Sequence, residues 1–320
     1  MGGSAYIAKR ALFAAITVFV AVTANFILFR MLPGSAVTDM SRVPNASPTL
    51  VNALKQEFGL DKPKFDQYLI YLRQLTRGNF GVSYITQQPV RTMIARGLEN
   101  TLPMACIGVL VAIVLGVGSG IVAAWRRDTL VGYGTTFSAM VIYSFPTQWL
   151  GLMLILLLGG LLPTSGMRNE FLIDSSFWQR SADYLQHLLL PSLTYGLTLY
   201  GQYALVVRSS MLETMGEDYV LTARAKGLPM RRIMLRHIFR NALLPVTTLI
   251  ALSLGFIVAG AILIETVFSW PGIGLLIYNA VLNRDYPLLQ GSFLVVTVSV
   301  VFFNFLADLL YFKLDPRISA

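Results

Sequence analysis

The chain has 320 residues, of which 55% are hydrophobic and only 13% are charged, and its mean hydropathy is +0.63. This composition excludes a soluble globular protein, because too few polar residues are present to cover a surface in contact with water. The net charge of +9 does not indicate nucleic-acid binding, since Lys and Arg also gather on the cytoplasmic loops of membrane proteins. The single cysteine, Cys106, excludes a disulfide framework and a thiolate metal cluster, so we expect no metal site.

Six stretches without Asp, Glu, Lys or Arg are long enough to cross a bilayer, whose apolar core of about 30 Å needs roughly 20 residues of helix. A single buried charge would cost roughly 3 kcal/mol, so six uncharged stretches are a strong signal. They are residues 11–29, 101–124, 129–162, 188–207, 242–264 and 288–307. The sequence therefore predicts an all-α polytopic membrane protein with six transmembrane helices.

The first stretch follows Lys9 and Arg10, an arrangement that is also typical of a signal peptide. We interpret it as a membrane anchor instead, because the run is longer than the apolar region of most signal peptides and no small-x-small cleavage pattern follows it. Residues 1–30 are thus expected to form the N-terminus and the first transmembrane helix.

The distribution of basic residues predicts the orientation. Of the 25 Lys and Arg, 13 lie on the side of the N-terminus, nine lie in residues 30–100, and only Arg168, Arg180 and Arg284 lie in the short loops of the other side. Long segments count little in the positive-inside rule, so the nine basic residues of 30–100 are set aside. The comparison is then between 13 basic residues on the side of the N-terminus and three on the other side. We expect both termini to be cytoplasmic.

Residues 31–100 are then expected to form an extracytoplasmic segment, and residues 101–320 a core of five transmembrane helices that includes a cytoplasmic loop at 213–241. The segment shows two amphipathic helical patterns, one at Leu50, Leu54 and Phe58 and a second from Phe65 to Leu75, followed by a glycine turn. These patterns predict a small folded cap. The alternative is a helical hairpin that lies on lipid headgroups.

Glycine and proline residues modify the expected core. Pro146 interrupts the third stretch and predicts a kinked or tilted helix. Gly116, Gly118 and Gly120 in the second stretch predict close packing against a neighbouring helix. Around residues 270–274, Pro271 and two glycines predict a tight re-entrant turn on the outer face, and Trp270 with Tyr286 fits an aromatic belt at the membrane interface.

The loop at residues 213–241 is the most informative part of the chain. Glu217 and Asp218 place negative charge at the start of a short helix, and Gly227 allows the left-handed residue that ends it. A second helix opens at Pro229, and small residues leave the bend open to close approach by a partner. Arg232, Arg236 and Arg240 form a basic stripe that fits either anionic lipid or a protein.

The run EDYVLTARAKGL resembles the EAA loop of ABC importer permeases, in the branch that carries dipeptides, oligopeptides and nickel. In that family the loop docks into a groove of a cytoplasmic ATPase. The resemblance implies this coupling role for Glu217, Asp218, Ala223, Arg224, Ala225, Lys226 and Gly227. It implies a supporting coupling helix that contains Arg236, His237, Asn241 and Pro245.

Further matches to the same family extend over nearly the whole chain. They are Leu32-Pro33-Gly34, the run from Gly78 to Ser83, Ser144-Phe145-Pro146, the run from Glu265 to Gly274, the run from Arg284 to Pro287, and Asp315-Pro316-Arg317. Ser35 and Asn79 differ from the family pattern, in which Asp is commoner at both positions. The resemblance implies the fold of a type I ABC importer permease in a bacterial inner membrane.

The chain itself is not expected to be an enzyme or to bind a cofactor, because no G-x-x-x-x-G-K-[ST] phosphate loop occurs in it. The resemblance implies that partner ATPase subunits bind ATP and Mg. It also implies two such ATPase subunits, a second homologous permease and an extracytoplasmic substrate-binding protein, with membrane lipid around the helices and no nucleic acid.

Dipeptides or oligopeptides are the expected cargo, and nickel, glutathione or another small solute are the alternatives within the family. The residues that would contact the cargo stay open, with Asn25, Gln148 and Gln202 as polar candidates. An ion-coupled secondary transporter is disfavoured, because it would need inverted repeats and carboxylates within the membrane. A membrane scaffold without transport activity is the remaining alternative.

Overall fold

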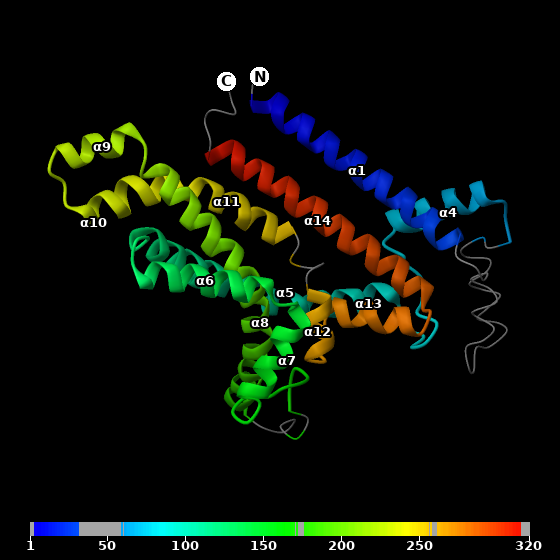
Figure 1. The fold of residues 1–320 in the computed structure, drawn as a ribbon. Helices are drawn as coiled ribbons and strands as arrows, with labels where there is room; N and C mark the ends of the chain where they lie inside the picture. The colour runs from blue at the N-terminus through cyan, green and yellow to red at the C-terminus, as the bar shows by residue number, and fades with distance from the viewer. Residues whose placement is uncertain are drawn as a thin grey trace.

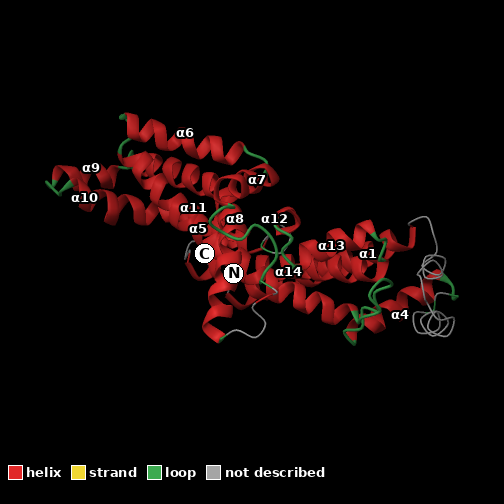
Figure 2. Cartoon of the chain, turned by 90° about the horizontal axis from the view of Figure 1, so that it is seen from below, coloured by secondary structure: helices red, strands yellow, loops and turns green. Residues whose placement is uncertain are grey.

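The computed structural model describes residues 3–31, 59, 61–169, 171, 176–255, 257 and 261–314. These residues form helices and loops, with one isolated β-bridge between Val82 and Pro89 and no strand (Figure 2). The prediction of an all-α membrane protein is confirmed. The helices are α1 (Gly3–Met31), α4 (Lys64–Thr76), α5 (Val90–Trp125), α6 (Leu130–Ser144), α7 (Thr147–Leu158), α8 (Phe177–Thr214), α9 (Asp218–Ala225), α10 (Met230–Arg232), η2 (Ile233–Ile238, a π-helix), α11 (Phe239–Gly255), α12 (Ile262–Val267), α13 (Ile273–Leu282) and α14 (Tyr286–Leu314).

The number of uniformly apolar spans differs from the six uncharged stretches. In the described part of the chain, α1, α5 and α14 are each long and apolar enough to cross a membrane. The number rises to five if each of two bent pairs is one span, α6 with α7 and Met230–Leu243 with Pro245–Gly255. The remaining stretch, 188–207, lies inside the long helix α8. Its Tyr, Thr and Gln residues make it less apolar than the others.

The third uncharged stretch is not one helix, because the chain bends by 108° between α6 and α7. Phe145 adopts an extended conformation directly before Pro146, and Pro146 precedes the first residue of α7. A residue before proline disfavours the helical conformation, and proline is tolerated at a helix start, so the local sequence explains the break. The interruption expected at Pro146 is present, but it divides the stretch into two helices instead of kinking or tilting one.

The first and last helices lie side by side and antiparallel, so the N-terminal end of α1 is next to the C-terminal end of α14 (Figure 1). An ion pair between Arg10 and Asp308, with 3.0 Å between the charged atoms, joins them there. At the other end α4 packs on α1, where the hydroxyl groups of Thr23 and Tyr68 are 2.7 Å apart. The second helix of the predicted cap is therefore present, whereas the first pattern, at Leu50 to Phe58, lies outside the described residues.

The most extensive helix contact joins α5 and α8. A side-chain carbon added at Gly116 would lie 2.5 Å from Tyr203 Cβ, and one added at Gly120 would lie 2.7 Å from the carbonyl oxygen of Ala204. These distances leave no room for a side chain, so the prediction of an interface at both positions is confirmed. Gly118 faces open space, and the same prediction is wrong there.

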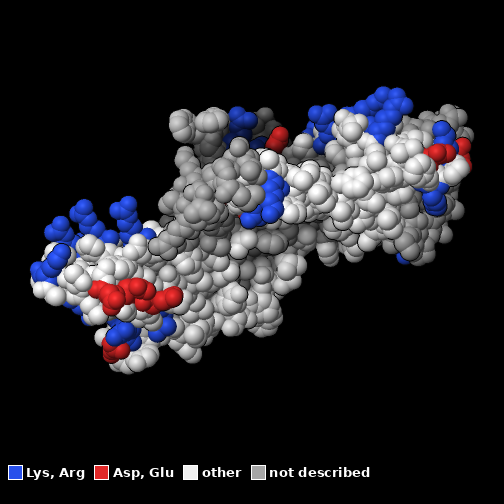
Figure 3. Space-filling view, turned by 90° about the horizontal axis from the view of Figure 1, so that it is seen from above, with Lys and Arg blue, Asp and Glu red and all other residues white. Residues whose placement is uncertain are grey.

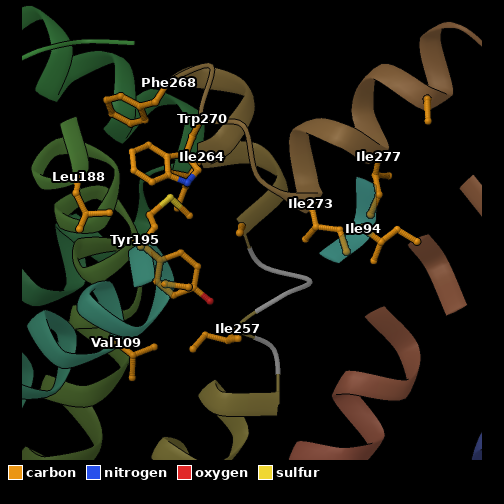
Figure 4. Packing of buried hydrophobic residues seen from close by; sticks show 14 of the residues in the cluster. Ile94, Val109, Leu188, Tyr195, Ile257, Ile264, Phe268, Trp270, Ile273 and Ile277 are labelled. Carbon is orange, nitrogen blue, oxygen red and sulfur yellow. The ribbon is translucent and has the colours of Figure 1, made fainter. Parts of the chain in front are cut away.

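The main hydrophobic cluster lies where α5, α8, α12 and α13 meet (Figure 4). Trp270 is fully buried in it, in the turn between α12 and α13, and its indole N–H donates to the carbonyl oxygen of Asn100 at 3.0 Å. The tight turn is confirmed, but the assignment of Trp270 to an aromatic belt is wrong because the ring belongs to the core. Tyr286 is half-buried and packs against the same cluster.

The glycine contacts predict different effects for two similar substitutions. Gly116→Leu should lower the free energy of unfolding by about 1–3 kcal/mol, because the new side chain would force α5 and α8 apart. The measurement is the thermal unfolding midpoint of the purified protein in detergent. Gly118→Leu is the matched control, and equal losses for the two variants would contradict the described interface.

Candidate functional site

The loop at 213–241 forms two helices joined by a bend, and we call residues 217–241 the elbow. Helix α9 follows Glu217, and the chain reverses at Gly227, whose φ of 72° lies in the left-handed region that glycine adopts without strain. Two hydrogen bonds close the bend, from the N–H of Gly227 to Arg224 O at 2.9 Å and from the N–H of Leu228 to Ala223 O at 3.4 Å. This pattern is a Schellman cap, as the position of the glycine predicts.

The second helix of the elbow is longer than expected. Pro229 precedes α10, which continues through the π-helix η2 into α11 without a loop. A π-helix is rare and usually occurs where a function requires the irregularity. The elbow is therefore the end of a continuous helical arm that leads to α11.

One face of the elbow is part of the core. Val220, Ile233, Met234 and Ile238 are all buried, and they cluster with residues of α8 such as Met211. Ala223 is buried in the same cluster, with 6% of its surface exposed. The expectation that Ala223 leaves the bend open to a partner is therefore wrong, because its small side chain permits packing within the chain.

The opposite face of the elbow is exposed. It presents the remaining predicted residues together with two large side chains that the sequence analysis did not select, Leu221 at 53% exposure and Tyr219 at 39%. The exposed predicted residues are Glu217, Asp218, Arg224, Ala225, Lys226 and Gly227. Leu221 and Tyr219 therefore add apolar surface to a face that otherwise presents charged and small residues.

Charged side chains surround this face. Figure 3 shows Lys and Arg over the end of the molecule that carries α9 and α10, with acidic residues beside them. The basic stripe is present as predicted, since Arg232, Arg236 and Arg240 are all exposed, and none forms an ion pair with another described residue.

A polar contact joins the first helix of the elbow to α11. The side-chain amide of Asn241 donates to the Tyr219 hydroxyl at 2.6 Å, and that hydroxyl lies 3.5 Å from the carbonyl oxygen of His237. Asn241 and His237 thus belong to one contact, whereas Pro245 lies one turn further along α11 and is exposed. The pair of Tyr219 and Asn241 fixes α9 relative to α11.

A second polar site lies at the start of the second uncharged stretch, remote from the elbow in sequence. Glu265 is fully buried, and it accepts a hydrogen bond from the Thr101 hydroxyl at 2.6 Å and one from the N–H of Leu275 at 2.9 Å. Thr101 also accepts from the N–H of Ile273 at 2.9 Å. The carboxylate therefore caps the N-terminus of α13 and fixes it to α5, an arrangement that we call the carboxylate lock.

The three polar candidates for contact with cargo lie on different helices. Asn25, in α1, donates to the carbonyl oxygen of Gln290 at 3.0 Å and to the Tyr71 hydroxyl at 3.4 Å, so its amide serves helix packing. Gln148 is exposed at the start of α7, and Gln202 is half-buried in α8. Among the residues that the structure describes, no hydrogen bond brings these three side chains together.

Comparison with known proteins identifies the family of the chain. Residues 112–320 match the family described as "Binding-protein-dependent transport system inner membrane component", and residues 4–105 match the N-terminal part of the corresponding membrane components. The chain belongs to this family. It is a multi-pass inner-membrane permease subunit of the ABC importer type, as the resemblance of its elbow sequence implied.

Individual relatives cover nearly the full length of the permease. The chain is 36% identical over 323 residues, 95% of both chains, to the dipeptide transport system permease protein DppB of Escherichia coli K12. It is also 36% identical, over 98% of both chains, to the di/tripeptide transport system permease protein DppB of Pseudomonas aeruginosa. The glutathione transport system permease protein GsiC of Escherichia coli O1:K1 is 34% identical over 98% of both chains.

The carboxylate lock of this permease generates a prediction. Thr101→Val should lower the free energy of unfolding by about 1–3 kcal/mol, because it removes a donor to a buried carboxylate and an acceptor for a buried N–H. Thermal unfolding in detergent measures the loss. Thr135→Val is the control, since Thr135 is half-buried and its hydroxyl donates only to the carbonyl oxygen of Val131 in its own helix. A loss no larger than that of the control would contradict the role of Thr101.

Proposed function

We propose that this chain is the dipeptide-translocating permease of an ATP-driven importer, and that its elbow is the docking site for an ATPase subunit. The observation that carries the proposal is the full-length similarity to permeases named for dipeptide and di/tripeptide transport. Glutathione is itself a tripeptide, and the relative named for its transport is nearly as similar, so short peptides are the shared chemistry.

The proposed orientation places both termini and the elbow in the cytoplasm. The excess of Lys and Arg on that side supports it. A cytoplasmic elbow can reach an ATPase, and the chain has no phosphate loop of its own. The proposed assembly contains two ATPase subunits that bind ATP and Mg, a second homologous permease and an extracytoplasmic substrate-binding protein.

The exposed face of α9 supplies the docking surface. Leu221 offers an apolar contact that water would otherwise cover, and Glu217, Arg224 and Lys226 surround it with charges of both signs. Interfaces commonly combine an apolar centre with a polar rim. Gly227 contributes the bend that turns this face outward, and a side chain there would be strained.

Movement of the elbow would reach the membrane helices by two routes. The buried residues Val220 and Ala223 pack in one cluster with α8, and the contact of Tyr219 with Asn241 connects α9 to α11. A push from the ATPase dimer on closing would therefore displace α8 and α11 together. Such rigid displacement of packed helices can exchange inward-open and outward-open arrangements.

The cargo is tested by uptake. Cells that lack this chain should lose ATP-dependent uptake of labelled dipeptides, and re-expression of the chain should restore it. Longer peptides, glutathione and nickel ion are measured in parallel, with ATP-depleted cells as the control. Unchanged uptake of dipeptides would contradict the peptide assignment, and uptake that survives ATP depletion would favour an ion-coupled carrier.

The docking surface is tested by Leu221→Arg. The variant should insert and fold normally, because Leu221 is exposed, but its affinity for the ATPase should fall by about 2 kcal/mol, or about thirtyfold. Co-purification with the ATPase subunits and ATP-dependent uptake are the two measurements.

Ile85→Arg is the matched control for this prediction. Ile85 is similarly exposed, at 50%, but lies in the loop before α5 rather than in the elbow. Retained co-purification for Leu221→Arg would exclude α9 as the docking surface.

A further inference from the structure

A groove of about 340 Å³ lies between the first turns of α5 and the helix α13. From α5 it is lined by Met93, Arg96 and Asn100, which share one helix face. From α13 it is lined by Leu275, Leu276 and Asn279. Its volume lies within the range of about 300–1,000 Å³ that is usual for small-molecule sites.

The two helix backbones touch beneath the groove. A side-chain carbon added at Gly97 would lie 3.0 Å from the backbone of Ile273, so the helices cross there without intervening side chains. The carboxylate lock joins the same two helices directly behind this crossing, through Thr101 and Glu265. The walls of the groove are therefore held in place without a ligand, which reduces the entropic cost of binding.

The lining of the groove combines apolar side chains with polar ones. Met93, Leu275 and Leu276 give it an apolar middle, and Arg96 and Asn279 supply hydrogen-bond donors at its edges. Arg96 has no ion-pair partner among the residues that the structure describes. The Asn100 amide already has a hydrogen-bond acceptor within the chain, since it donates to the carbonyl oxygen of Pro271 at 2.8 Å.

No described carboxylate forms an ion pair with Arg96. Glu265 lies behind Gly272 and is satisfied by Thr101 and by the N–H of Leu275. Glu99 is exposed on α5 and is not among the lining residues. The groove thus presents an unpaired guanidinium next to apolar side chains and a free amide.

We infer that this groove binds the translocated peptide, with the C-terminal carboxylate on Arg96, the peptide group on Asn279 and an apolar side chain against Met93, Leu275 and Leu276. The inference rests on the proposed function in peptide transport. A guanidinium matches a carboxylate through two parallel hydrogen bonds, which is the strongest recognition available to such a ligand. Arg96 lies five residues before Thr101, where the uncharged stretch begins. The site is therefore at the end of the membrane-spanning region.

Thiol labelling tests the inference in membrane vesicles that carry the complete transporter. The parent chain has Cys106→Ser, and Leu276→Cys adds one thiol in the groove. Dialanine at about ten times its dissociation constant should slow modification by a charged methanethiosulfonate about tenfold. Tyr278→Cys is the control, because Tyr278 is exposed on α13 but does not line the groove, and its labelling should not change.

The carboxylate contact is tested in the same Leu276→Cys background. Arg96→Ala should abolish protection by dialanine, whereas Arg91→Ala, which removes an exposed arginine of α5 outside the groove, should preserve it. Dialanine amide, which lacks the carboxylate, should not protect the Leu276→Cys chain that retains Arg96.

Three results would overturn the inference. These are no protection by dialanine in vesicles that import it, full protection in the Arg96→Ala variant, and equal protection by the peptide-free binding protein, which would make that protein the occupant. Failure of the parent vesicles to import dialanine at all would instead contradict the proposed function.

Discussion

The close approach of α5 and α8 is the contact on which the rest of the structure depends. Glycines on α5 let its backbone touch α8 at Gly116 and Gly120, and Gly196 of α8 fits against Val111 and Gly108 of α5 in return. The first turns of α5 carry the groove and the carboxylate lock, and the last turn of α8 leads directly into the elbow. A rigid helix pair therefore connects the two sites.

Much of this packing could be predicted from helical periodicity, and the error at Gly118 shows how. Gly116 and Gly120 are one turn apart and share a face, whereas Gly118 points to the opposite side. Ala223 and Ala225 are two residues apart, as Gly116 and Gly118 are, and so they also point to different sides of their helix. This explains why Ala223 is buried and Ala225 is exposed. A family motif lists small residues together, but the helix divides them between internal packing and the outer surface.

Long-range pairings could not be predicted from the sequence. Thr101 and Glu265 are 164 positions apart, and only the fold brings them within hydrogen-bond distance. Trp270 carried an ambiguous signal, because an indole fits either a membrane interface or a core with one acceptor for its N–H. Local signals were more informative: Pro146 predicted an interruption, although of one kinked helix rather than two, and Gly227 predicted the bend of the elbow.

The buried carboxyl group of Glu265 explains why the groove is fixed in place, whereas the elbow, beyond the other end of the helix pair, is held on one face only. Burial of a carboxyl group without partners would be costly, but here the Thr101 hydroxyl and the N–H of Leu275, in the first turn of α13, hydrogen-bond to it. Leu275, Leu276 and Asn279 follow within two turns of this cap, so its geometry fixes the groove wall. The elbow follows α8 and is anchored by buried residues on only one face, so an external force can move it more easily than the groove wall.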